Sequence, residues 1–479
     1  MAWALMDPRA MKRTPRVVVW GLAGLLASCA SPSTDPDGAQ PADAGAQLPD
    51  AGTVAAVPRV VFLAQRNGTA TPVDEVIYAE PVVARFEGLT PGEHVLLHAR
   101  LWGYHSVVEF EVGPDGVVDL GRDAPLGGDY QGVDPDGPIW SMIKENNSFE
   151  QHYNVDFTVE RDGAVVLERT LVRLPLGMDA TVRNVTELGL VGRLYVPPGP
   201  PRGVVVVVGG SEGGLDASLF NAAYVETMGY AALALAYFGA EGVPEQLTEI
   251  PLEYFETAFQ WLQAQPDVDG NHVVMMGGSR GGELALLVGA TFPQHVDGVV
   301  ATVPSGVVFG STADDTRSAW SRANTPVPYW NVSANVPPVT ERLPGGTTGY
   351  RYAPGTQMQL ETLKQDALAL ERVRIPVENT AGPVLMVAAG DDGLWPSCAL
   401  MDVAWQRLAA RGNVLDRAVC LEDAGHLVGT PGWPTSENYV TSMFGQFVIL
   451  GGTPQGNGRG ARVFDLALRE FLDAVLNQP

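Results

Sequence analysis

Positively charged side chains are scarce in this chain of 479 residues, which carries 30 lysines and arginines against 55 aspartates and glutamates. The formal net charge is −25 at pH 7. Nucleic acids and anionic membrane surfaces attract clusters of basic side chains and are repelled by an acidic surface. The composition therefore excludes nucleic acid as an expected partner.

Cysteine is scarcer still, with only Cys29, Cys398 and Cys420 in the whole chain. None of the three has metal-ligand spacing with a histidine, so we expect no zinc site, no other metal and no cofactor. Cys398 and Cys420 would be able to pair in an oxidising compartment. No spacing motif decides whether they do, and both possibilities stay open.

The apolar run near the start of the chain, Val17–Leu26, is too short to span a membrane. A basic segment at 11–16 precedes it, and this combination is typical of a secretory signal. The run ends in Leu26-Ala27-Ser28-Cys29, which resembles the lipobox of bacterial lipoproteins. We therefore expect residues 1–28 to be a lipoprotein signal peptide and Cys29 to be the lipidated first residue of the mature chain. An ordinary cleaved signal with an incidental cysteine is the alternative.

A lipid anchor at Cys29 would hold the protein at the membrane of the bacterial cell envelope, outside the cytoplasm. Ala30 stands where an aspartate commonly signals inner-membrane retention in enterobacteria, which favours the outer membrane. Residues 29–57 are rich in Ala, Pro, Asp and Gly and contain almost nothing to bury. We expect this segment to be a disordered tether.

The residues after the tether are too many for a single domain with one hydrophobic core, and the residue pattern changes near residue 197. We therefore expect two domains. Residues 58–197 contain short alternating runs separated by turn signals, which predict an immunoglobulin-like antiparallel β-sandwich. Four of the seven histidines lie in this domain, and we expect them to be solvated or structural rather than ligands. The candidate strands of the sandwich are Val60–Leu63, Val82–Phe86, His94–Leu101, Val107–Val112, Val155–Val159 and Ala164–Val172.

Residues 198–479 alternate apolar strands with helical stretches, which predicts a doubly wound parallel sheet. Gly203–Val208 is a continuous β-branched run, typical of a strand buried on both faces. A segment rich in Pro, Thr and Gly, Ser305–Pro376, interrupts the alternation and forms either a lid or a plain surface insertion. The other elements expected here are strands at Ala231–Tyr237, Val296–Val303, Pro383–Ala388 and Leu415–Leu421 and helices at Leu252–Gln263 and Ala461–Leu476.

The stretch Val273–Val288 carries the strongest chemical signal, a serine between glycines where a strand turns into a helix. In the nucleophile elbow of α/β-hydrolases, the strained turn leaves no room for a Cβ two residues before or after the serine. Gly277 and Gly281 meet that need around Ser279. We therefore predict that Ser279 is a catalytic nucleophile rather than part of an ordinary tight turn.

A serine nucleophile needs a base, and among the three histidines of this domain only His426 follows a predicted strand at the carboxyl edge of the sheet. Asp391 and Asp392 follow another strand at the same edge, and we prefer Asp392 as the carboxylate that orients the imidazole. The resulting chain order of serine, aspartate and histidine is that of the α/β-hydrolases. The sequence therefore predicts a C-terminal α/β-hydrolase domain with the triad Ser279, Asp392 and His426.

The glycine-rich loop Gly209–Gly214 occupies the place of the oxyanion-hole loop of this fold. We expect the backbone N–H of Ser211 or Glu212, together with that of Arg280, to hold the oxyanion. A phosphate-binding loop is the competing interpretation, but the loop has neither Gly-Lys-Ser/Thr nor the G-x-G-x-x-G fingerprint.

With these residues in view, the chain resembles the family of type I acyl-CoA thioesterases and bile acid-CoA:amino acid N-acyltransferases. The resemblance covers nearly all of Val60–Leu476, and the second aspartate of the family's Asp-Asp pair matches Asp392. The segments that carry it include Asp119–Gly128, Gly192–Pro198, Leu252–Ala258, Gly277–Leu284, Asp391-Asp392, Gly425-His426 and Gly451–Pro454. The resemblance implies a β-sandwich joined to an α/β-hydrolase domain and an acyl thioester substrate.

Ser279 departs from the cysteine that the family's amino acid acyltransferases typically carry, so hydrolysis of an acyl-serine by water is expected rather than transfer. The family usually acts inside cells, whereas the predicted lipid anchor places this chain where little CoA is present. Three functions therefore stay open: an acyl-CoA thioesterase, an extracytoplasmic esterase or acyltransferase to an amine or alcohol, and an envelope binding protein with an inactive hydrolase fold.

Overall fold

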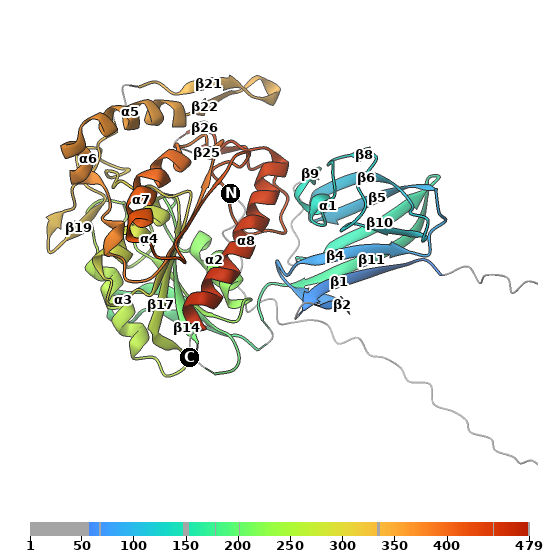
Figure 1. The fold of residues 1–479 in the computed structure, drawn as a ribbon, viewed down its shortest axis with the longest axis horizontal. Coiled ribbons are helices and arrows are strands. Elements are labelled where there is room, and N and C mark those ends of the chain that lie inside the picture. Colours follow the sequence, from blue (N-terminus) through green and yellow to red (C-terminus); the bar gives the residue numbers. More distant parts are fainter. Residues whose placement is uncertain are drawn as a thin grey trace, which may run out of the picture.

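The computed structural model describes residues 57–66, 69–146, 153–177, 179–200, 202–332, 336–443 and 445–477. The predicted signal peptide, the predicted lipidation site Cys29 and all but the last residue of the predicted tether lie outside the described residues. The chain forms a β-sandwich beside a larger α/β domain, which confirms the two-domain prediction (Figure 1). Among the described helices, none combines the length and the apolar content that a membrane crossing requires.

The N-terminal domain packs two sheets face to face, and their strand pairs are antiparallel except for the parallel pair β3–β11. Alternation creates the shared core, since in β5 every second side chain is buried and its neighbours face outward. One sheet has the order β2-β1-β4-β7 and comprises β1 (Arg59–Arg66), β2 (Thr69–Val73), β4 (Val82–Glu87) and β7 (Val117–Asp119). The other has the order β3-β11-β10-β5-β6-β8, with β9 also on β6, and comprises β3 (Glu75–Ile77), β5 (His94–Leu101), β6 (Tyr104–Glu111), β8 (Gly127–Gly128), β9 (Ile143–Lys144), β10 (Val155–Arg161) and β11 (Ala164–Leu174). A short helix, α1 (Gly137–Trp140), lies between β8 and β9 in the chain.

The predicted domain boundary at residue 197 needs correction. The strands β12 (Thr181–Val185) and β13 (Val191–Val196) fall within the predicted sandwich, but they form the antiparallel edge of the large sheet of the α/β domain. β13 pairs with β15 (Ala231–Ala236) over Val191–Tyr195, and Leu194 of β13 shares a buried core with Leu233 and Leu235 of β15. The boundary therefore lies between β11 and β12.

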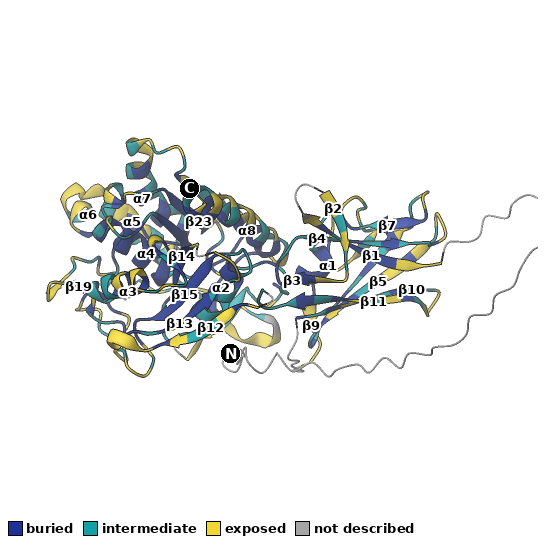
Figure 2. Cartoon of the chain, turned by 90° about the horizontal axis from the view of Figure 1, so that it is seen from below, coloured by how far each residue is buried: buried dark blue, intermediate teal, exposed yellow. Residues whose placement is uncertain are grey.

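The large sheet has the order β12-β13-β15-β14-β17-β18-β23-β24, and it is parallel from β15 onward. Its central strands are buried on both faces, as their continuous apolar runs predict (Figure 2). In β14, the even-numbered valines Val204, Val206 and Val208 enter the core on one face of the sheet. The odd-numbered Val205 and Val207 enter the core on the other face. The remaining strands of this sheet are β14 (Gly203–Val208), β17 (Asp269–Gly278), β18 (Gly298–Thr302), β23 (Val384–Ala389) and β24 (Arg417–Leu421).

Helices cover both faces of the large sheet. One face is covered by α3 (Glu253–Gln263), α4 (Arg280–Thr291) and α7 (Ser397–Arg411), and the other by α2 (Asp216–Glu226) and α8 (Pro454–Leu476). The predicted amphipathic helix at the C-terminus is thus real, but it begins seven residues earlier than the sequence suggested, at a proline after the capping Thr453.

The segment Ser305–Pro376 has secondary structure of its own, although its composition suggested a lid or a plain insertion. It builds two small sheets with flanking parts of the domain, in the orders β16-β19-β20 and β21-β22-β26-β25. It also carries α5 (Ala353–Gln365) and α6 (Ala367–Val373). The strands of these two sheets are β16 (Ile250–Pro251), β19 (Trp320–Arg322), β20 (Thr325–Pro326), β21 (Val339–Arg342), β22 (Thr348–Arg351), β25 (Val440–Met443) and β26 (Gln446–Ile449).

Candidate active site

Ser279 occupies a sharp turn between β17 and α4, with φ 56° and ψ −123°. A serine with positive φ is strained, and such strain is concentrated at functional sites. A Cβ at position 277 would strike the carbonyl of Gly281, and a Cβ at position 281 would strike the carbonyl of Gly209. The structure therefore confirms the predicted elbow geometry and the reason for both glycines.

His426 lies in the loop after β24, at the carboxyl edge of the sheet, as predicted. Its Nε2 is 2.9 Å from Ser279 Oγ, and its Nδ1 is 2.8 Å from Asp392 Oδ2. The other two histidines of the domain lie elsewhere, His272 beside Asp269 and His295 beside Glu256. The structure thus brings together the three side chains that the sequence selected.

The two adjacent aspartates differ in their burial and in their contacts. The Asp392 side chain is only 1% exposed, and its Oδ1 accepts hydrogen bonds from the backbone N–H groups of Leu394 and Trp395. The Asp391 side chain is 45% exposed and accepts hydrogen bonds from Arg351 and from the backbone N–H of Gly452 instead. Of the pair, Asp392 is therefore the residue that meets the imidazole.

The glycine-rich loop after β14 lies close to Ser279. A Cβ added at Gly210 would be only 3.3 Å from Ser279 Cβ. The Tyr237 hydroxyl donates to the carbonyls of Gly209 and Gly210, at 2.9 and 3.3 Å, and so fixes this loop. The Glu212 carboxylate folds back to accept the Gly210 N–H at 2.8 Å. The oxyanion roles of the Ser211, Glu212 and Arg280 N–H groups stay predictions, with the loop that carries them at the correct side of Ser279.

A buried ion pair directly behind the nucleophile was not predicted. The Arg280 and Glu283 side chains are 2.7 Å apart in the first turn of α4, and both are almost completely buried. Arg280 also donates to the carbonyls of Phe309 and Gly310, and Glu283 accepts from the Trp320 indole. Burial raises the pKa of Glu283 to about 7. Two opposite charges three residues apart in an otherwise apolar helix were the signal that could have revealed this pair.

This ion pair connects the elbow to the segment Ser305–Pro376, because Phe309, Gly310 and Trp320 all belong to that segment. The Phe309 ring packs on Trp395 at 5.1 Å between centroids, and Trp395 packs edge-on against His426 at 5.9 Å. Through Trp395, the segment therefore packs beside His426 and the other candidate side chains.

Cys398 and Cys420, whose pairing the sequence left open, form a disulfide with Cα atoms 5.6 Å apart. The bond joins the first turn of α7 to β24. These are the elements that lie next to the Asp392 and His426 loops, so the disulfide ties together the supports of two site residues.

Comparison with known proteins assigns the chain to a family. A model described as BAAT / acyl-CoA thioester hydrolase C terminal matches residues 250–478, and one described as acyl-CoA thioester hydrolase/BAAT N-terminal region matches residues 79–187. The chain belongs to the acyl-CoA thioester hydrolase/BAAT family. The resemblance seen in the sequence is thereby confirmed, and the family and the fold together make the protein a thioester hydrolase by class.

Relatives of the family are similar over most of their length. Human acyl-coenzyme A thioesterase 1 is 29% identical over 411 residues, which cover 81% of this chain and 91% of the relative. Human mitochondrial acyl-coenzyme A thioesterase 2 is 28% identical over 408 residues, covering 81% and 79%. The mouse peroxisomal succinyl-coenzyme A thioesterase is 26% identical over 411 residues, covering 81% and 91%.

Among solved structures, the dienelactone hydrolase-like promiscuous phosphotriesterase P91 from metagenomic libraries matches with a TM-score of 0.37 and 16% identity. The match covers 62% of this chain and 99% of that one. A likeness at this level carries no argument about function.

Proposed function

We propose that the protein hydrolyses acyl thioesters through a Ser279–His426–Asp392 triad and an acyl-serine intermediate. The observation that carries the proposal is the continuous hydrogen-bonded path from Asp392 through His426 to the strained Ser279. In this path the carboxylate holds the Nδ1–H tautomer, so the lone pair of Nε2 faces the serine hydroxyl. The family membership supports a thioester as the bond that is cleaved.

In the first step His426 accepts the Ser279 proton while the serine oxygen attacks the acyl carbonyl. The backbone N–H of Arg280, at the first position of α4, and an N–H of Ser211 or Glu212 stabilise the oxyanion. The protonated imidazole then gives its proton to the leaving thiolate. In the second step His426 activates water, which attacks the acyl-serine ester and releases the carboxylic acid.

Acyl-CoA is the first substrate to test, because the similar proteins are named acyl-coenzyme A thioesterases. Serine rather than cysteine at position 279 favours water over an amine as the acceptor. The net charge of −25 opposes a polyanionic leaving group, so an uncharged ester is the specific alternative that the composition supports.

We further propose that the mature protein is lipid-anchored at Cys29 and faces away from the cytoplasm at the cell envelope, with the outer membrane favoured. The basic and apolar residues before Leu26-Ala27-Ser28-Cys29 support this proposal. Radiolabelled palmitate should enter the full chain expressed in a bacterium and should not enter the Cys29→Ala variant. Equal labelling of the two chains would rule out the anchor.

The test of the reaction compares residues 30–479 with their Ser279→Ala variant on palmitoyl-CoA and on p-nitrophenyl palmitate. Release of CoA that depends on Ser279 and exceeds ester cleavage establishes the thioesterase. Ester cleavage alone moves the reaction to another acyl substrate. Full activity of the Ser279→Ala variant on either compound would refute the proposed nucleophile, and product formed with added glycine would reveal acyl transfer.

A further inference from the structure

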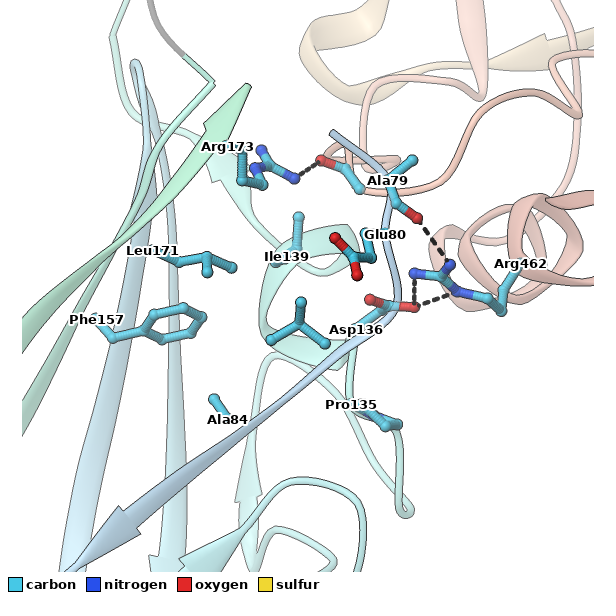
Figure 3. A pocket seen from close by; sticks show the side chains of 12 residues that line it. Ala79, Glu80, Ala84, Pro135, Asp136, Ile139, Phe157, Leu171, Arg173 and Arg462 are labelled. Atoms are coloured by element: carbon cyan, nitrogen blue, oxygen red, sulfur yellow. Dashed lines mark hydrogen bonds and ion pairs between the residues drawn. The ribbon is translucent and has the colours of Figure 1, made fainter. Parts of the chain in front are cut away.

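The loop that follows the catalytic histidine, residues 426–439, docks on the other domain. We call this segment the histidine loop. Near its middle, the Tyr78 hydroxyl donates to the Pro431 carbonyl at 2.8 Å. Arg173 donates to the Gly432 carbonyl at 2.8 Å, and Figure 3 shows this hydrogen bond of Arg173 as a dashed line. Both side chains belong to the sandwich domain, and both are buried.

Further along, the histidine loop repeats the same kind of contact. The Thr435 N–H donates to the Trp140 carbonyl at 3.0 Å, and the Ser436 hydroxyl donates to the Met142 carbonyl at 2.7 Å. The Tyr104 hydroxyl donates to the Glu437 carboxylate at 2.8 Å. The sandwich therefore supports the loop from Pro431 to Glu437, beginning five residues after His426.

Aromatic rings fill the space between these hydrogen bonds. Trp433 of the histidine loop lies 4.8 Å from Trp102, 5.4 Å from Tyr153 and 5.5 Å from Tyr78, measured between ring centroids. Phe220 completes the group at 6.0 Å from Trp433. Phe220 lies on α2, the helix that follows the glycine-rich loop beside Ser279. We call these five rings the aromatic cluster, and it touches supports of both the base and the oxyanion loop.

Trp102 reaches the aromatic cluster from a strained position. Leu101 pairs with Tyr104, so Trp102 and Gly103 form the two-residue turn between β5 and β6. Trp102 has φ 53°. This position favours Asn, Asp or Gly, and a bulky residue there is disfavoured. We infer that the contacts of Trp102 across the domain boundary stabilise the fold by more than the strained backbone of this turn costs.

We propose that Trp433 and Trp102 are positioning residues for catalysis, through which the sandwich domain holds the histidine loop and thereby His426. The inference rests on the proposed function, because His426 is taken as the base. At its start the loop is fixed by the hydrogen bond from His426 N to the Leu450 carbonyl, 2.8 Å long. Val428 is buried in the core of the α/β domain and the Thr435 hydroxyl donates to the Pro454 carbonyl, so that domain also holds the loop. From Pro431 to Glu437 the sandwich adds its own contacts, and loss of the aromatic cluster weakens the hold on the loop on one side of the imidazole.

The test uses Trp433→Leu with a matched control, Phe110→Leu. Phe110 is a completely buried ring of the sandwich core, paired with Val95 at the end of the β5–β6 hairpin opposite Trp102. Both variants replace a packed aromatic ring by leucine, but only Trp433→Leu changes a residue of the histidine loop. We expect kcat to fall on the order of 10²-fold in Trp433→Leu, with KM near the wild-type value, because small displacements of a catalytic group cost that much. Phe110→Leu should keep the wild-type kcat.

Two further variants separate positioning from general stability. Trp433→Phe should restore most of kcat, since it keeps a ring in the cluster. Trp102→Gly removes the contact but suits the positive φ, so it should keep the turn and still lower kcat. A Trp102→Gly variant with wild-type kcat would overturn the proposal even if Trp433→Leu did not fold.

Hydrogen exchange of the backbone in 426–432 tests the same inference without any substrate. We expect faster exchange in Trp433→Leu than in the wild type and in Phe110→Leu. Unchanged exchange, or an equal loss of kcat in the control, would overturn the proposal. If instead Ser279→Ala kept full activity, the proposed function would fail while the exchange result still decided whether the sandwich holds the loop.

Discussion

Replacing Asp392 by asparagine tests the assignment of the acid, because Asp391 beside it provides a control of the same chemistry. The Asp392 carboxylate accepts three hydrogen bonds, two on Oδ1 from backbone N–H groups and one on Oδ2 from His426 Nδ1. An amide has a single acceptor oxygen. If that oxygen keeps the Leu394 and Trp395 N–H groups, the amide NH2 faces Nδ1 of the imidazole.

An NH2 group at that place forces the proton of a neutral imidazole onto Nε2, where it faces Ser279 Oγ. His426 then has no lone pair with which to accept the serine proton. In a Ser-His-Asp triad this wrong tautomer lowers kcat by about 10⁴-fold, or about 5.5 kcal/mol of transition-state stabilisation. Asp391→Asn changes a half-exposed carboxylate that binds Arg351 and Gly452, so it should leave kcat close to the wild-type value.

The assay is the rate at which a fluorophosphonate labels Ser279, which needs no knowledge of the natural substrate, together with kcat on the preferred acyl substrate. Circular dichroism establishes that both variants are folded. The reasoning is refuted if Asp391→Asn loses the activity and Asp392→Asn retains it, or if both variants label as fast as the wild type.

Three other substitutions test the elbow, the buried ion pair and a histidine of the sandwich. Gly281→Ala should lower kcat on the order of 10²-fold, because the new methyl strikes the Gly209 carbonyl and displaces the glycine-rich loop; steady-state kinetics equal to the wild type would contradict this. Glu283→Gln leaves Arg280 buried without its counter-ion and should cost about 3–5 kcal/mol of the free energy of unfolding, measured by urea denaturation above pH 8, where Glu283, with a pKa of about 7, is ionised; an unchanged midpoint would show that the pair contributes nothing. Burial, and then the neighbouring His105, lower the pKa of His98, so the unfolded state binds its proton more readily. The stability should therefore be complete above the unfolded pKa of about 6.5 and fall below it, less steeply in His98→Gln, as melting temperatures across pH 5–8 would record.

The site could be predicted because each of its parts has a local signal. The elbow needs small residues at fixed offsets from Ser279, and the buried strand before it is a continuous apolar run. Asp392 and His426 each follow such a strand, and carboxyl ends of parallel strands meet at one edge of a sheet. Three short patterns and one rule of topology were therefore enough to place side chains that are up to 147 positions apart.

The domain boundary could not be predicted in the same way. A half-exposed antiparallel edge strand has the same alternating pattern whether it closes a sandwich or extends a mixed sheet. Val191–Val196 joins the large sheet through its partner β15, which lies beyond the predicted boundary, and Thr181–Val185 joins it only by pairing with Val191–Val196. The partner of an edge strand is a property of the whole fold and leaves no mark in the strand itself.

The contacts between the domains are the most distant in sequence and the least predictable. Tyr78 and Pro431 are 353 positions apart, and no period or motif links them. Yet the sandwich, whose sequence contains no catalytic motif, meets the α/β domain at the loop that carries His426. A domain that served only solubility or anchoring would have no physical reason to place a strained tryptophan and a buried arginine against that loop. The position of these contacts is therefore the argument that the two domains form one catalytic unit, whichever acyl substrate the serine receives.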